Sequence, residues 1–225
     1  MPTPGNIKRQ IDAIVRYLVE IGLAGDQNFA FQREVTGGLV EVTFPQASHV
    51  SIALKDRSYN EIYEHLSLER AYNAKMPDGA LIQMMYLFAG TTVQRHRLAF
   101  FPAPHLEEFQ NNPEIYLEDQ IYADVISRSI VPFPLRFDYD ARVGSHQEVH
   151  HPKSHLTLGQ YEKCRIPVTA PLTPFWFTEF ILRNFYHTAF LSYADQLPTF
   201  KENFGETILP AEKKVIHIQI PSGVV

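Results

Sequence analysis

The chain has 225 residues, of which 45% are hydrophobic and 20% are charged, a balance that is ordinary for a globular domain with a sizeable core. Its formal net charge of −5 excludes a chain that is basic throughout, although a local basic patch is compatible with it. The single cysteine, Cys164, excludes an internal disulfide and fits a reducing compartment.

The first elements along the chain are a helix and a hairpin. Thr3 and Pro4 predict the start of a helix, whose apolar residues recur at helical spacing as far as Leu18. The runs 29–35 and 39–45 both alternate between polar and apolar residues, and a Thr-Gly-Gly join separates them. This pattern predicts a β-hairpin directly after the first helix.

A second helix and a pair of longer strands follow. Residues 51–54 predict a short strand, and Ser58 with Glu61 forms a capping box that starts a helix. The apolar residues of this helix are Ile62, Tyr63, Leu66 and Tyr72. The runs 81–88 and 91–101 predict two paired strands joined by a tight turn.

The C-terminal half begins with a region rich in proline and acidic residues and then returns to strands. We expect short helices within 104–109 and 117–127, strands at 135–140, 154–159 and 164–168, an apolar helix from Thr173-Pro174 to about Phe190, and a last strand at 214–220. The whole chain, 1–225, is therefore predicted to be a single α+β domain with a mostly antiparallel sheet and helices packed on one face. It shows no signal peptide or membrane-spanning run, so we expect a cytoplasmic protein without a membrane partner.

Strand alternation gathers polar side chains from the three strands after residue 134 on one surface. Cys164 falls on the opposite, apolar side, so we expect it in the core rather than in a reactive site. If the three strands form a meander, the polar surface holds Arg136, Asp138, Asp140, His155, Thr157, Lys163 and Arg165. The loop above this surface carries three further histidines, His146, His150 and His151.

Three interpretations of this surface stay open. The first is structural, because a half-solvated antiparallel sheet always has a polar face whose charges form weak pairs. The second is a metal site, in which histidine nitrogens and an aspartate oxygen bind zinc, manganese or iron. Its ligands would be His146, His150, His151 and His155 with Asp138 or Asp140. No HExxH or HxH pair supports it, and apart from such a divalent metal we expect no cofactor.

The third interpretation is a metal-free, ribonuclease-like site. His151 and His155 would act as general base and general acid, and Asp138 would orient a histidine. Arg136 and Arg165 would bind the phosphate. Arg95 and Arg97 share one face of the strand at 91–101 and could extend the basic surface, although a solvated or ion-paired face explains them equally well. Aromatic residues make up 12% of the chain and could support base stacking, but their periodic pattern favours core packing.

Four segments also resemble a known family. They are RFDYD at 136–140, HHPKSHLTLG at 150–159, CRIP at 164–167 and FILRNFY at 180–186. These segments resemble a bacterial family catalogued as domain-of-unknown-function family 2290, over most of the chain and most distinctively between Phe133 and Tyr186. The resemblance implies no activity. The region from Arg136 to His155 is also similar to small toxin proteins of toxin–antitoxin systems, which implies nucleic-acid chemistry or phage defence.

Two functions therefore remain open at the level of sequence. The first is a bacterial cytoplasmic protein that acts on RNA or another phosphodiester. The second is a non-catalytic partner or structural protein whose polar face is a docking or ion-paired surface. The expected partner is RNA or an operon-encoded protein. The sequence leaves enzymatic activity and oligomeric state undecided.

Overall fold

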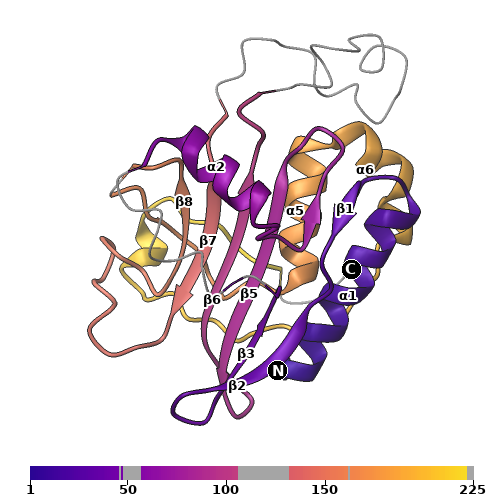
Figure 1. Cartoon of the computed structure of the whole chain (residues 1–225). Helices are drawn as coiled ribbons and strands as arrows, with labels where there is room; N and C mark the ends of the chain where they lie inside the picture. Colours follow the sequence, from indigo (N-terminus) through magenta and orange to yellow (C-terminus); the bar gives the residue numbers. More distant parts are fainter. Residues whose placement is uncertain (46, 48–56, 106–131, 162, 222–225) are drawn as a thin grey trace.

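The fold was analysed in a computed structural model, which describes residues 1–45, 47, 57–105, 132–161 and 163–221 (Figure 1). Its helices and strands, in chain order, are α1 (Pro4–Glu20), β1 (Asp26–Gln27), β2 (Phe31–Val35), β3 (Leu39–Thr43), α2 (Tyr59–Leu68), β4 (Ala74–Lys75), β5 (Leu81–Ala89), β6 (Thr92–Phe101), β7 (Leu135–Asp140), β8 (Ser154–Leu158), β9 (Ile166–Pro167), α5 (Pro174–Phe185) and α6 (His187–Tyr193). Two short 3-10 helices, η3 (Ala194–Gln196) and η4 (Glu212–Lys214), follow them. Within these described residues no helix combines the length and the apolar character needed to cross a membrane.

The strands of the described residues form one nine-stranded sheet. Its main path is β1-β4-β5-β6-β7-β8-β9, and the hairpin β2–β3 joins it because β3 also pairs with β5. All of these strand pairs are antiparallel. The predicted α+β class with a mostly antiparallel sheet is confirmed, as are the two hairpins and the β7–β8–β9 meander.

Helices cover both faces of this sheet. On one face α1 and α5 pack against the strands, and Ile11, Ile181 and Met84 are fully buried in the resulting core. The shorter α2 packs on the other face, where Leu66 meets Leu81 in a second, smaller core. Neighbouring strand residues belong to different cores because their side chains alternate between the faces. The longest helices thus share one face as expected, and α2 lies opposite them (Figure 1).

Helix capping places the starts of the helices where the sequence predicts them. Thr3 accepts a hydrogen bond from the backbone N–H of Asn6 at the start of α1. Both halves of the Ser58–Glu61 capping box form at the start of α2. However, α2 ends at Leu68, so Tyr72 lies beyond the helix instead of on it, although its ring still joins the second core.

The predicted helix from Pro174 to about Phe190 is two helices. The first, α5, ends at Phe185, and Tyr186 leaves the helical conformation with φ −136° and ψ 50° before α6 begins. The Tyr186 hydroxyl donates to the carboxylate of Asp78, at 2.9 and 2.8 Å from its two oxygens. This partly buried contact to a distant turn coincides with the break between the two helices.

The last two predicted strands are shorter than expected. β9 contains only Ile166 and Pro167, although the backbone N–H of Val168 still donates to the Ser154 carbonyl at 2.9 Å. The run 214–220 forms no strand, and a single parallel bridge joins Ile218 to Val168. The strand expected at 51–54, the helix expected in 117–127 and most of the run 104–109 lie outside the described residues.

Candidate functional site

The charged side chains of β6, β7 and β8 lie in register on one face of the sheet. Arg97, Asp138 and His155 are cross-strand partners in one row across the three strands. The next cross-strand pair on the same face is Arg136 on β7 with Thr157 on β8, two residues away from the row. This face is the one that α2 covers near the other end of β6. The row places three of the predicted site residues beside one another, because a period of two residues keeps them on one face.

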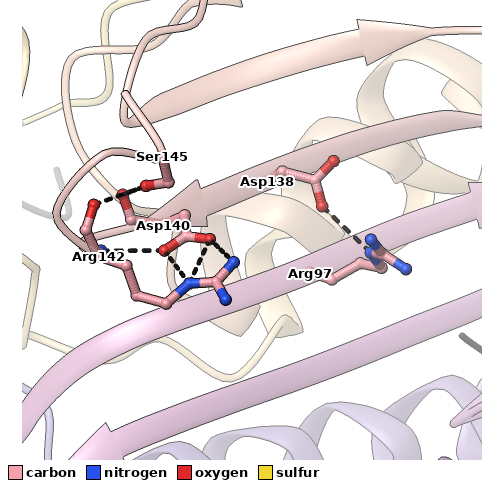
Figure 2. A network of polar contacts seen from close by, with 5 residues as sticks. All are labelled: Arg97, Asp138, Asp140, Arg142 and Ser145. Atoms are coloured by element: carbon pink, nitrogen blue, oxygen red, sulfur yellow. Dashed lines mark hydrogen bonds and ion pairs between the residues drawn. The ribbon is translucent and has the colours of Figure 1, made fainter. Parts of the chain in front are cut away.

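Asp138 is the centre of the positive side chains on this face. The Nε atom of Arg97 lies 3.2 Å from one carboxylate oxygen, as Figure 2 shows, and Nε of Arg136 lies 3.7 Å from the other. Burial alone would raise the pKa of Asp138, but the charges of Arg97 and Arg136 hold it below its usual value. Asp138 is therefore ionised at neutral pH, and one negative charge faces two arginines.

A third arginine brings the site to a net positive charge. Burial lowers the pKa of the Arg136 guanidinium, and the positive charges of Arg97 and Arg165 lower it further against the attraction of Asp138. Arg165 is fixed by hydrogen bonds from Nη1 to the carbonyl oxygen of Cys164 at 2.8 Å and to Oγ1 of Thr157 at 3.3 Å. Two arginines beside one carboxylate, with a third on neighbouring Thr157, leave capacity for a bound anion.

His155 is buried, with 4% of its surface exposed, and its ring is held by the backbone. Its Nδ1 lies 2.8 Å from the carbonyl oxygen of Pro152. A carbonyl can only accept, so Nδ1 carries the proton of the neutral ring and Nε2 carries the lone pair. Burial lowers the pKa of His155 to about 4. The imidazole is therefore neutral at pH 7, with a basic nitrogen that makes no hydrogen bond to any described residue.

The orienting role predicted for Asp138 belongs instead to the backbone of Pro152. Asp138 faces His155 across the strands, but its carboxylate oxygens are engaged by Arg97 and Arg136. Only its charge reaches the imidazole, where it opposes the effect of burial on the pKa of His155.

His151 is the other histidine at the site. Its ring packs edge-on against that of His155, with 5.0 Å between the ring centroids. Burial and then the positive charge of Arg165 lower the pKa of His151. The two histidines predicted as an acid–base pair are thus neighbours, but both favour the neutral form at pH 7. A general acid at this position would have to gain its proton when a negative ligand arrives.

A tight loop presents His151 to the site. The backbones of Gln147 and His151 exchange two hydrogen bonds, of 3.0 and 2.7 Å, and His150 N–H donates to the Glu148 carbonyl at 2.8 Å. Val149, between them, has φ 66°. A β-branched residue in this left-handed region is strained, so neighbouring structure must hold the turn in place.

The other two loop histidines make no ring contact with His155 among the described residues. His146 Nε2 lies 3.2 Å from the carboxylate of Glu212, which is buried at the start of η4. His150 is exposed. In the part of the chain that the structure describes, no three histidine, cysteine, aspartate or glutamate side chains are grouped so that they could hold a metal ion. The four histidines of the metal alternative therefore do not converge.

The remaining charges lie at the end of β7. Arg142 binds the carboxylate of Asp140 with its guanidinium, and Ser145 closes the same turn onto the Arg142 carbonyl at 2.8 Å (Figure 2). Arg95 is exposed and is the cross-strand partner of Asp140. Cys164 is half-buried instead of buried, because it lies in the turn before β9 begins.

Sequence reasoning missed one feature of this site and one of the core behind it. The Pro152 carbonyl is a backbone acceptor, for which residue types give no signal. The second is His96, which lies next to Arg97 but points into the opposite core and accepts a hydrogen bond at Nε2 from the Leu172 N–H at 3.1 Å. Burial lowers the pKa of His96 to about 4, so it is a neutral core histidine. The alternation of β6 already assigns His96 to the face opposite Arg97.

Fold and site together define an α+β protein with a positively charged histidine–arginine site on one face of an antiparallel sheet. The chain belongs to the family described as "Uncharacterized conserved protein (DUF2290)", whose model matches residues 23–220 and so contains the whole site. This confirms the family resemblance, whereas the likeness to toxins stays a prediction. Comparison with curated proteins and with solved structures found no match.

Proposed function

We propose that this chain binds RNA at the face formed by β6, β7 and β8 and cleaves its phosphodiester bonds without a metal ion. One observation carries the proposal: two arginines flank Asp138 on the sheet face, a third contacts Thr157 on the same face, and two neutral imidazoles lie in contact beside them. Arginines suit the phosphate because their planar, permanently charged groups match its oxygens. A neutral imidazole has a nitrogen lone pair that can accept a proton, as a general base must.

Each side chain has one role in the proposed reaction. Nε2 of His155 accepts the proton of the ribose 2′-hydroxyl, whose oxygen attacks the neighbouring phosphorus. The bond from phosphorus to the 5′-oxygen breaks, and protonated His151 donates a proton to that oxygen. Arg97, Arg136 and Arg165 bind the phosphate and stabilise the charge that develops on it. The products are one end with a cyclic phosphate and one with a 5′-hydroxyl.

The proposed setting is the bacterial cytoplasm, in a toxin–antitoxin or phage-defence system that includes an operon-encoded partner protein. The support is indirect, namely the arginine–aspartate strand and paired-histidine loop that such toxins also have. A cell that expresses the active protein without its partner would lose RNA and stop growing.

A docking surface for a partner protein is the alternative function. Two observations favour it: Asp138 is already paired with Arg97 and Arg136, and only 4% of His155 is exposed. On this account the face recognises an acidic partner, and the histidines only fill space beneath the 147–151 turn.

Alanine variants of His151 and His155 separate the two functions. The RNase account predicts that each variant loses at least 100-fold of the rate at which bulk RNA is cleaved, a typical loss for a general acid or base at ~10²–10⁴-fold. The matched control is His187→Ala, because His187 is exposed on α6. Circular dichroism and thermal unfolding would establish that each variant is folded. Unchanged cleavage in folded variants, or none in the unaltered protein, would rule out the RNase account and leave the docking surface.

A further inference from the structure

The turn between β8 and β9 carries an aromatic side chain that the fold leaves uncovered. Tyr161 has 76% of its surface exposed. Its ring lies over Gly159, where a Cβ atom would meet the ring carbons at 3.4 and 3.5 Å. Gly159 has φ +61°, which glycine adopts freely, so it forms the bend of the turn. Because it has no side chain, the Tyr161 ring can lie against its backbone. Phe133, 49% exposed, borders the same glycine, with its Cβ 3.8 Å from that position.

This turn is directly connected to the arginine face. The backbone N–H of Cys164 donates to the Tyr161 carbonyl at 3.3 Å, so Arg165 follows immediately after the closed turn. The guanidinium of Arg165 in turn contacts Thr157 on β8. From His155 to Gly159 is four strand residues, about 14 Å at ~3.4 Å per residue. An aromatic ring thus lies a short distance along the chain from the proposed reaction centre.

Further cationic side chains surround the turn. Lys163, within it, is exposed. The side-chain amide of Gln160 donates to the carbonyl of Arg57 at 3.0 Å and so brings exposed Arg57 beside it. An exposed aromatic ring on its own is ordinary. An exposed ring flanked by several cations matches how proteins bind single strands, with charge on the backbone and a ring against the bases.

We propose that the ligand of this surface is single-stranded RNA, whose phosphates follow the three arginines of the site and one of whose bases stacks on Tyr161. The proposal rests on the proposed function for its choice of RNA. Duplex RNA is excluded as the preferred ligand because its bases are stacked on one another and offer no free face to a ring. The stacking is tolerant of base identity, since every base has a π face.

The test measures binding separately from cleavage. The probe is a short fluorescent RNA with 2′-O-methyl groups, which cannot be cleaved by attack of the 2′-oxygen. Fluorescence anisotropy should show that the single strand binds at least tenfold more tightly than the same sequence as a duplex. Tyr161→Ala should weaken that binding about tenfold, whereas Tyr161→Phe should retain it. Leu191→Ala is the control, because Leu191 is equally exposed but lies on α6.

A second measurement tests the stacking in the unaltered protein, without any substitution. Aminopurine placed in the single strand should lose fluorescence on binding the unaltered protein, because stacking on an aromatic ring quenches it. Equal binding of single strand and duplex, or binding unchanged in a folded Tyr161→Ala protein, would overturn the inference. If the single strand binds as expected but unmodified RNA stays intact, the inference stands and only the proposed cleavage fails. If RNA is cleaved but no stacking is seen, the inference fails alone.

Discussion

Asp138 and His155 face each other across β7 and β8, yet the hydrogen bond that orients His155 comes from the Pro152 carbonyl, 2.8 Å from Nδ1. Asp138 is engaged by Arg97 and Arg136 on either side of the same face. The carboxylate therefore balances the arginines, and the backbone fixes the tautomer of the histidine. This division of roles leads to different expectations for the two residues.

Replacing Asp138 with asparagine should strengthen phosphate binding while it weakens the fold. The change removes the charge that neutralises Arg97 and Arg136, so inorganic phosphate should bind several-fold more tightly. The lost charged hydrogen bond should lower the free energy of unfolding by about 1–3 kcal/mol. Calorimetric titration with phosphate and urea denaturation measure the two effects. Asp140→Asn is the control, since its pair with exposed Arg142 should contribute less than about 1 kcal/mol. Weaker phosphate binding by Asp138→Asn would contradict the account.

Stability should fall as the pH is lowered from 7 to 5. The pKa values of His155 and His96 are lowered from 6.5 to about 4 in the fold. Between these values the unfolded chain binds protons that the folded chain does not, so each histidine lowers the free energy of unfolding by about 1.4 kcal/mol per pH unit. The stabilisation is complete above pH 6.5 and is lost as the pH falls toward 4. Urea denaturation at several pH values measures the slope.

His155→Gln supplies the internal comparison for this slope. With one of the two buried histidines gone, the pH dependence between 6.5 and 4 should become shallower by about 1.4 kcal/mol per pH unit, whatever the absolute stability of the variant. His187→Gln, at an exposed position, is the control for the substitution itself. A slope that is the same in all three proteins would mean that His155 titrates as it does in the unfolded chain.

The strained turn at Val149 should be improved by glycine. Val149 has φ 66°, a conformation that costs a β-branched residue of order 1–3 kcal/mol, whereas glycine adopts it freely. Val149→Gly should therefore raise the free energy of unfolding by about 1 kcal/mol, after the added freedom of the unfolded chain is deducted. Val143→Gly is the matched control in the same loop, because the φ of exposed Val143 is not positive. Equal destabilisation by both substitutions would contradict the inferred strain.

Phosphate should raise the pKa of His151. Burial and the positive charge of Arg165 lower this pKa in the free protein. An anion bound between His151 and Arg165 would offset that charge. Proton NMR of the imidazole signals across a pH series, with and without phosphate, would follow the change. Arg165→Met should reduce the response. A pKa of His151 that does not move on phosphate binding would remove the proposed general acid.

The sequence predicts correctly which side chains lie on this face wherever the strand alternation alone determines it. Arg136, Asp138 and His155 are assigned to one side by a period of two residues, and the β6 register then adds Arg97. The chemistry within the face depends on more than alternation. The acceptor for His155 is a backbone atom whose position depends on the geometry of the whole loop.

Long-range contacts explain the remaining differences. The break between α5 and α6 accompanies a hydrogen bond between Tyr186 and Asp78, which are 108 residues apart in the sequence. Local patterns cannot predict such a pair, and the apolar run therefore looks like one helix. Alternation assigns Cys164 to the core, but a turn closed by its own N–H replaces the strand at that point.

The most direct test of the account is the chemistry of the cleaved ends. Purified protein would be incubated, with a chelator present, with an RNA oligonucleotide and with the same sequence made of DNA, and mass spectrometry would identify the products. The account predicts that RNA alone is cut, with cyclic phosphate and 5′-hydroxyl ends, and that His155→Ala abolishes the cut. Intact RNA, a requirement for added metal, or equal cleavage of the DNA would contradict it.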